Sequence, residues 1–385
     1  MNLKFLKSLL RYTIAAVVVG FFVVLNGCDD DDGPTIFNGT VVELIQSDEF
    51  KQATNGDATK SLDSLVKYLS LNPDLVALVG TSPEVTLFAP SNTAFVNLLA
   101  TPGFPSNIAD INPDIIKGVL AYHVVSSKAL SGDVTAGASF VTNYKSTNAC
   151  TGVQTDQAIE VNTNGTLKTG STNQDIDIVV ADKQAANGVV HVVESVMIPP
   201  ATGASLTPIL GKLAATVLLG ADFTILARFM TKADCGVSGV TPLSNVLAGP
   251  DTSPLTAFLP PNVVFEGTAA EAGVTVDQLL ASFSAAQCRQ IILNHVVSGS
   301  VARSALTNGA QLTTLLDAAA KLNVTVIPSA NCTPGASATN PYCTIFSTSG
   351  GSTSLGGTTQ APLLVPDIAH SNGVGHVVGK ILIPN

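Results

Sequence analysis

The stretch "TLFAPSNTAF", residues 86–95, decides the fold, because a loosened copy, "TAFLPPNVVF", returns at residues 256–265. Its first half predicts a buried strand that Pro90 ends, since proline cannot donate the next ladder hydrogen bond. Ser91 can then cap the helix that carries Phe95. A strand, a proline turn and a helix start therefore occur twice in one chain.

Two further pairs of segments follow in the same order. "AYHVVSS" around His123 is matched by "LNHVVSG" around His295, and "NGVVHVVESVMIP" (187–199) is matched by "NGVGHVVGKILIP" (372–384). The offset between the copies grows from 170 to 185 residues along the chain. A unit of this size is larger than a solenoid repeat and can have its own core. The sequence therefore predicts a tandem duplication of one domain.

Within each copy the pattern changes from helix to strand. Leu62, Leu65, Val66 and Leu69 have the spacing of a helix that packs on one face. Asn112-Pro113-Asp114 predicts another helix start, with a cap, a first-turn proline and a favourably placed acid. From His123 onward, short β-branched runs separated by Asn- and Gly-rich turns indicate antiparallel sheet. We expect an α+β fold, each domain being a β-sandwich or wedge-like sheet core with helices gathered on one side.

The N-terminus has the features of an export signal. Lys4, Lys7 and Arg11 precede an apolar run that ends in Leu25-Asn26-Gly27-Cys28. This end resembles the lipobox of bacterial lipoproteins, in which the cysteine is lipidated after cleavage. We expect residues 1–27 to be a lipoprotein signal peptide and Cys28 to carry the lipid; the alternative is an ordinary signal peptide or anchor with a coincidental cysteine.

An acidic run, Asp29 to Asp32, follows Cys28 and predicts a solvated tether over residues 28–36. The first domain is then expected at 37–202 and the second at 203–385. The acidic run resembles surface-export signals of some Gram-negative lipoproteins, whereas Asp29 directly after the cysteine resembles an inner-membrane retention signal. We favour a lipid-anchored protein of the bacterial cell envelope, at the outer membrane and facing the cell surface.

The charge of the chain limits its partners. Its formal net charge is −10, and removal of residues 1–27 would make it −13. Nucleic acid is an unsuitable partner because phosphate binding needs clustered Lys and Arg. The sequence has no G-x-S-x-G elbow, no H-E-x-x-H helix, no P-loop and no Cys-x-x-Cys, so we predict no enzyme, no cofactor and no metal site.

Five cysteines remain once Cys28 is assigned to the lipid, and an exported chain meets an oxidising compartment. Cys332 and Cys343 flank a Pro-, Gly- and Ser-rich insert that is absent from the first copy, and they can close its loop. Cys235 and Cys288 are the second predicted pair, which leaves Cys150 single.

Taken in order, "TLFAPSNTAF", "YHVV" and "NGVVHVVESVMIP" resemble the first box, the Tyr-His motif and the second box of fasciclin-like domains. The resemblance covers residues 37–385 as two domains. It is weaker in the second copy, where Ala257, Pro261 and Val263 alter the first box and Asn294 replaces the tyrosine. It implies a secreted or surface-anchored adhesion module that binds proteins, matrix components or glycans and is not known as an enzyme class.

The resemblance also suggests roles for particular residues. His191 and His376 are expected to be structural, tying the second box to the first. Tyr122 with His123, and Asn294 with His295, are either packed residues or a partner-binding spot. We expect adhesion or protein interaction with a partner on a neighbouring cell or in the envelope. The alternative is a periplasmic or surface lipoprotein that binds a glycan or a small molecule, although the chain has no Trp and only 5% aromatic residues.

Overall fold

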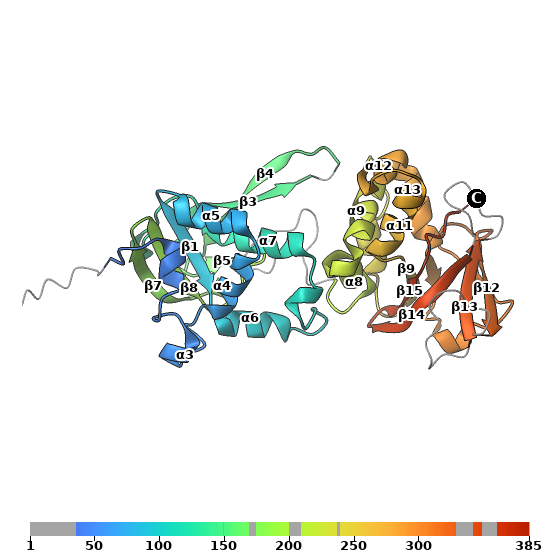
Figure 1. The fold of residues 1–385 in the computed structure, drawn as a ribbon, viewed down its shortest axis with the longest axis horizontal. Helices are drawn as coiled ribbons and strands as arrows, with labels where there is room; N and C mark the ends of the chain where they lie inside the picture. Colours follow the sequence, from blue (N-terminus) through green and yellow to red (C-terminus); the bar gives the residue numbers. More distant parts are fainter. Residues whose placement is uncertain are drawn as a thin grey trace, which may run out of the picture.

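The structure is a computed structural model that describes residues 36–148, 150–168, 175–199, 209–236, 239–328, 342–348 and 360–384. Two α+β domains follow one another along the chain (Figure 1). Cys28 and Cys332 lie outside the described residues, as does most of the tether. Within the described ranges, no helix is both long and apolar enough to cross a membrane.

Short helices precede or interrupt the sheet of the first domain. Their starts follow from the sequence: Ser91 accepts a hydrogen bond from the backbone N–H of Ala94, and Asn112 accepts one from Asp114. Thr40 and Glu43 form a capping box. The helices are α2 (Val41–Ile45), α3 (Gln52–Asn55), α4 (Asp63–Ser70), α5 (Pro73–Thr81), α6 (Asn92–Leu99) and α7 (Pro113–Tyr122), with the 3-10 turns η1 (Ile108–Asp110) and η2 (Ser131–Asp133).

One eight-stranded sheet completes this domain, in the order β6-β5-β4-β3-β2-β1-β8-β7. Its outer strands, β6 and β7, are separated along the chain only by Asp177, so the sheet folds back on itself. The strands are β1 (Val85–Pro90), β2 (Val124–Val125), β3 (Ser139–Thr147), β4 (Gln154–Val161), β5 (Leu167–Lys168), β6 (Asp175–Ile176), β7 (Ile178–Ala185) and β8 (Gly188–Val193).

The folded sheet gives the domain two hydrophobic cores. Strand β1 contributes to both because its side chains alternate between the two faces. Leu87 and Ala89 face the core shared with the helices, whereas Phe88 faces the core enclosed by the sheet, together with Tyr122 and Ile159. A strand buried on both faces explains why "TLFAP" is almost continuously apolar.

The second domain repeats this plan, with its helices together on one side of the sheet (Figure 1). Its helices are α8 (Leu213–Leu219), α9 (Thr224–Ala233), α10 (Leu243–Leu247), α11 (Asn262–Glu271), α12 (Val276–Ser282) and α13 (Ala285–Asn294), with η3 (Ala221–Phe223) and η4 (Arg303–Ala305). The sheet order is β10-β9-β15-β14-β13-β12-β11. The strands are β9 (Leu255–Leu259), β10 (Val296–Ser298), β11 (Gln311–Thr313), β12 (Lys321–Pro328), β13 (Tyr342–Thr348), β14 (Gln360–His370) and β15 (Gly373–Val378).

The predicted antiparallel sheet needs one correction. Strands β1 and β8 pair in parallel, with Phe88 opposite His191, and β9 and β15 pair in the same way, with Phe258 opposite His376. The two boxes lie far apart in sequence, so no hairpin geometry constrains them to run in opposite directions. The first and second boxes of each copy are therefore adjacent strands at the centre of the sheet.

Candidate interaction surface

The polar residues of the boxes bond inward rather than outward. Thr86 is fully buried; its hydroxyl donates to the carbonyl of Ser127 at 2.6 Å and accepts from the backbone N–H of Ala129 at 2.8 Å. In the second domain, Thr256 makes the same two bonds, to Gly299 at 2.6 Å and from Val301 at 2.8 Å. Thr86 thus fixes the loop that follows β2, and Thr256 fixes the loop that follows β10.

The box asparagines hold the ends of helices. The side-chain oxygen of Asn92 accepts from the N–H of Ser64 in the first turn of α4, and that of Asn262 accepts from Ile225 in the first turn of α9. These N–H groups have no partner within their own helices. Asn187 and Asn372, before the second-box glycines, likewise accept from Val41 and Leu213 and donate to carbonyls at helix ends.

His191 lies in the second box and joins three segments. Its ring stacks on Phe88 of the first box at a centroid distance of 5.4 Å. Nδ1 accepts from the backbone N–H of Asp182 at 3.3 Å, so Nε2 carries the proton and donates to the carbonyl of Ala129 at 2.9 Å. Burial lowers the pKa of His191, which keeps the ring neutral.

His376 repeats this arrangement in the second domain. It stacks on Phe258 at 5.5 Å, accepts from the N–H of Asp367 at 3.1 Å and contacts the carbonyl of Val301 at 2.8 Å. Asp182 and Asp367 both have a positive φ, of 59° and 57°, so the backbone conformation beside the imidazole is repeated as well. Both histidines thus contact the first box and a loop.

The Tyr-His motif is buried as well. His123 accepts from the N–H of Met197 at Nε2, so Nδ1 carries the proton and donates to Val119 at 2.7 Å. His295 does the same with Leu382 and Ile291. Burial lowers the pKa of both histidines to about 4. With both ring nitrogens satisfied, neither imidazole is free to act as a proton-transfer group.

The suggestion that this motif is a partner-binding spot is therefore wrong for this structure. Tyr122 and His123 are 0% exposed, Asn294 is 1% exposed and His295 is 5% exposed. The Tyr122 hydroxyl donates to Ala158 on β4 at 2.8 Å, and the Asn294 amide donates to Leu382 at 3.0 Å. All four residues face the core, so a partner cannot reach them in the folded protein.

The cysteine pairing also differs from the prediction. Cys235 is bonded to Cys150, with 5.1 Å between the Cα atoms, and Cys288 is a buried free thiol on α13. The predicted Cys235–Cys288 pair is wrong, because Cys235 is bonded instead to a cysteine of the other domain. The predicted Cys332–Cys343 pair involves Cys332, outside the described residues, and stays a prediction.

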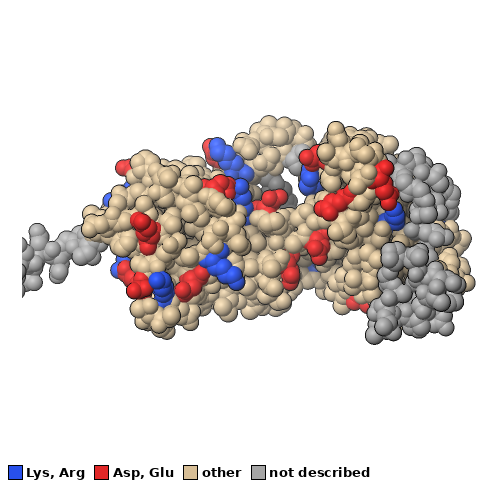
Figure 2. Space-filling model, in the orientation of Figure 1, with Lys and Arg blue, Asp and Glu red and all other residues tan. Residues whose placement is uncertain are grey.

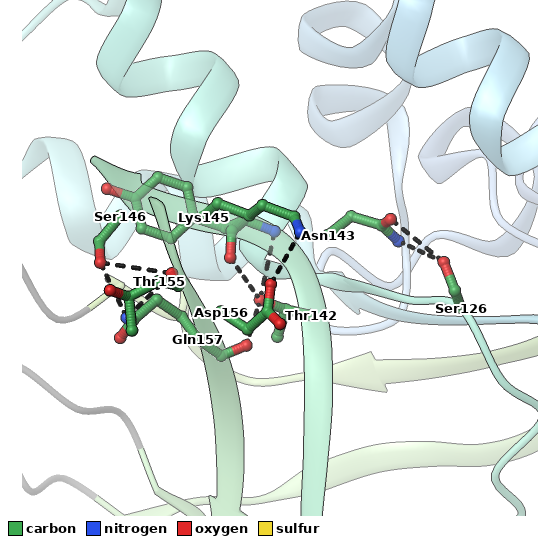
Figure 3. Close-up of polar contacts among 9 residues, drawn as sticks. Ser126, Thr142, Asn143, Lys145, Ser146, Thr155, Asp156 and Gln157 are labelled. Carbon is green, nitrogen blue, oxygen red and sulfur yellow. Dashed lines mark hydrogen bonds and ion pairs between the residues drawn. The ribbon is translucent and has the colours of Figure 1, made fainter. Parts of the chain in front are cut away.

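A projecting hairpin, β3–β4, extends from the first domain toward the second (Figure 1). Polar side chains line it (Figure 3): Lys145 and Asp156 form an ion pair at 2.9 Å, and Gln157 donates to Ser146 at 2.9 Å. Val141 and Val153 are 57% and 60% exposed. This surface, which we call the hairpin surface (residues 139–148 and 150–161), is reachable by a partner.

Charged side chains of both signs are mixed over both domains on the face of the molecule that Figure 2 draws. Ten described ion pairs accompany this mixture, mostly between partly exposed groups such as Lys117 with Asp74 at 2.6 Å. Among the described residues, no group of three or more His, Cys, Asp or Glu is arranged to hold a metal ion.

A cleft of about 420 Å³ lies between the two domains. Its walls include Phe104 and Asp110 of the first domain, and Thr216, Asp222 and His370 of the second. The His370 Nε2 atom is 3.4 Å from the Thr216 hydroxyl, and burial lowers the pKa of His370. Sequence reasoning missed both this cleft and the hairpin surface. The cleft is formed by residues of separate domains that share no motif, and the hairpin surface depends on the pairing of β3 with β4, which no motif in the sequence marks.

The repeated inward-facing hydrogen bonds and the paired cores define the class of this protein: a tandem pair of one α+β module. The chain belongs to the fasciclin family. The family model described as "Fasciclin domain" matches residues 58–199 and 222–384. The predicted family and fold class are thereby confirmed.

Individual relatives are distant. Transforming growth factor-beta-induced protein ig-h3 of Sus scrofa is 25% identical over 230 residues, which are 60% of this chain and 28% of that protein. Protein sll1483 of Synechocystis is 32% identical over 129 residues, 33% of this chain and 62% of that protein. The chain thus covers less than two thirds of either relative.

Among solved structures, a FAS1 domain pair from the insect cell adhesion molecule fasciclin I is similar to this chain. It is 15% identical, with a TM-score of 0.29, and the similarity covers 83% of this chain and 96% of the insect chain.

Proposed function

We propose that this protein is a lipid-anchored component of the bacterial cell envelope whose two fasciclin domains mediate adhesion, by binding a protein, matrix or glycan partner. The observation that carries the proposal is the inward bonding of the box residues within a fasciclin pair: Thr86, Asn92, His123 and His191, and their counterparts in the second copy, support the fold. Contact with a partner is therefore left to the outer surface.

The hairpin surface is the proposed contact region. Val141 and Val153 expose apolar side chains on a hairpin whose polar side chains form hydrogen bonds, and such a mixture suits a protein or matrix partner. We expect Val141→Ser with Val153→Ser to reduce aggregation of cells that display the protein. Val240→Ser is the matched control, because Val240 is 46% exposed on the second domain. Unchanged aggregation in the double variant, with normal display, would exclude the hairpin surface.

The anchoring is tested separately. Protease added to intact cells is expected to remove the domains, and Cys28→Ala is expected to release the protein from the membrane fraction. Cys288→Ala is the matched control, since Cys288 is buried. Protection from protease until the outer membrane is opened would place the protein in the periplasm and would contradict adhesion at the surface.

The interdomain cleft favours a second candidate function, the binding of a small molecule or glycan by a periplasmic or surface lipoprotein. Its volume of about 420 Å³ lies within the range of ligand sites. Native mass spectrometry of protein from its own cells would then show an added mass. We expect Thr216→Phe, which fills the cleft, to remove this mass. Its absence from the wild-type protein would reject this candidate.

A further inference from the structure

The outer half of the β3–β4 hairpin has little support from its own domain. Residues on both strands beyond Ser146 are exposed, from Thr147 on β3 to Asp156 on β4. A two-stranded hairpin of this kind is at best marginally stable by itself. Contacts in addition to the backbone pairing of its two strands therefore hold the hairpin in the extended position that Figure 1 shows.

Part of the support is a set of cross-strand bonds (Figure 3). Lys145 pairs with Asp156 at 2.9 Å, the Gln157 amide donates to the Ser146 hydroxyl at 2.9 Å, and the Thr142 hydroxyl donates to the Gln157 carbonyl at 2.8 Å. Such pairs stabilise a ladder by modest amounts each. They stiffen the base of the hairpin and direct its tip away from the first domain.

At the tip, Cys150 is bonded to Cys235, which follows α9 of the second domain. This end is firmly held: Asp234 accepts from Arg289 at 2.9 Å and from the N–H of Leu243 at 3.0 Å. Arg289 also donates to the Thr241 carbonyl at 2.7 Å. The disulfide thus connects a stiffened hairpin of one domain to a well-anchored helix end of the other.

Other connections between the domains are few. The N–H of Asn112 donates to Leu219 at 2.7 Å, and Gly211, which leads into α8, donates to Gly103 at 3.2 Å. Ile111 and Gly220 form an isolated bridge. Within the described ranges, the ion pairs and side-chain hydrogen bonds all lie inside one domain. Such an interface resembles those that allow domains to move relative to one another.

We propose that the Cys150–Cys235 disulfide is a redox-sensitive cross-link that fixes the orientation of the two domains and thereby the shape of the cleft between them. Cys150 is exposed and Cys235 is partly exposed, so a dithiol reductant can reach the bond. One thiolate of the dithiol reductant attacks a sulfur of the Cys150–Cys235 bond and forms a mixed disulfide. The second thiol of the reductant then attacks this mixed disulfide, so that Cys150 and Cys235 become thiols and the reductant becomes a disulfide. The hairpin tip is then free, and the domains keep their backbone hydrogen bonds and the packing of η1 against η3.

The linkage is tested first on the full chain, by alkylating free thiols and digesting without reduction. Trypsin cleaves after Lys145, Lys168, Lys232 and Arg289, so Cys150 lies in peptide 146–168 and Cys235 and Cys288 both lie in peptide 233–289. We expect the two peptides to be joined in the wild type and in Cys288→Ala. Loss of the joined mass in Cys288→Ala, or its persistence in Cys235→Ala, would overturn the assignment.

The effect on orientation is tested by hydrogen exchange of the full chain. We expect Cys150→Ser to speed exchange at least tenfold in the outer hairpin and at the interdomain amides of Asn112 and Gly211. Cys235→Ser should reproduce this effect, Cys288→Ser should not, and strands β1 and β8 should exchange as in the wild type. Unchanged exchange at Asn112 and Gly211 would show that the non-covalent interface alone fixes the orientation and would overturn the proposal.

Discussion

At the scale of single residues, the four paired histidines show how one side chain can serve two different hydrogen-bond patterns. His123 and His295 are protonated at Nδ1, because Nε2 accepts from a backbone N–H. His191 and His376 are protonated at Nε2, because Nδ1 accepts from an aspartate N–H. A second proton on any of these rings would remove an acceptor that a buried N–H requires.

This pattern predicts a loss of stability in mild acid. The pKa of His123 is about 4 in the folded protein and 6.5 in the reference state, so the unfolded chain binds more protons between these values. The contribution of neutral His123 to the free energy of unfolding is fully present above pH 6.5 and is lost as the pH falls to about 4. The difference corresponds to about 3 kcal/mol for each such histidine. Urea unfolding followed by circular dichroism at pH 7.5 and 4.5 measures it.

A variant separates His123 from other titrating groups. His123→Gln keeps a donor and an acceptor but does not titrate. We expect it to be less stable than the wild type at pH 7.5, with a smaller decrease in stability toward pH 4.5. An equally steep pH dependence in the variant would show that His123 does not contribute to the acid sensitivity.

The buried threonine of the first box, Thr86, is expected to stabilise the domain through its two hydrogen bonds. Thr86→Val keeps the shape of the side chain but removes the acceptor for Ala129 and the donor to Ser127. We expect a loss of about 1–3 kcal/mol in the free energy of unfolding, because the buried N–H of Ala129 becomes unsatisfied. Thr81→Val, at an exposed helix position, is the control. Equal effects of the two substitutions would contradict the role of Thr86.

At the scale of elements, the parallel pairing of the two boxes depends on a close backbone approach. A Cβ atom at Gly188 would overlap the carbonyl oxygen of Val85, and one at Gly373 would overlap that of Leu255. Glycine is required at the start of β8 and β15 for this reason, rather than for turn flexibility alone. The "NG" that opens each second box thus combines a helix-bonding asparagine with a glycine that admits the neighbouring strand.

Gly188→Ala is accordingly expected to destabilise the first domain by about 3 kcal/mol, because β1 and β8 must move apart. Gly132→Ala is a matched control, since a Cβ there would meet no atom within 4 Å. Thermal unfolding followed by circular dichroism compares the two variants. A melting temperature for Gly188→Ala equal to that of Gly132→Ala would refute the close approach.

The elements also show what sequence could and could not predict. The helix start at Asn112 and the cap at Ser91 follow from local chemistry, and both are confirmed. The parallel β1–β8 pair was missed because hydrophobic alternation does not encode strand direction. Burial of Tyr122 was left undecided for a related reason: an aromatic residue at the junction of a helix and a strand can face either way until the sheet folds back over it.

At the scale of the whole molecule, the two domains share the hydrogen bonds of their interiors because they are copies of one unit. The disulfide that connects them arises from residues in which the two copies differ. The hydrogen bonds of Thr86, His123 and His191 recur in the second copy, whereas the Cys150–Cys235 bond has no repeated counterpart among the described residues. No repeat comparison could predict this bond, because it joins a β-hairpin of one copy to a helix end of the other. Its effect on stability therefore belongs to the pair and not to either domain.

The Cys150–Cys235 disulfide is expected to stabilise both domains. The disulfide closes a sequence separation of 85 residues that includes parts of both domains. The chain-entropy relation gives roughly 4–5 kcal/mol for a loop of this length, as an upper bound. Because the bond limits the freedom of either domain when it unfolds, we expect Cys150→Ser to lower both unfolding temperatures in calorimetry. Cys288→Ala keeps the Cys150–Cys235 disulfide, adds no buried polar group and is the control. A decrease in the unfolding temperature of only one domain would show that the disulfide stabilises that domain alone and not both domains.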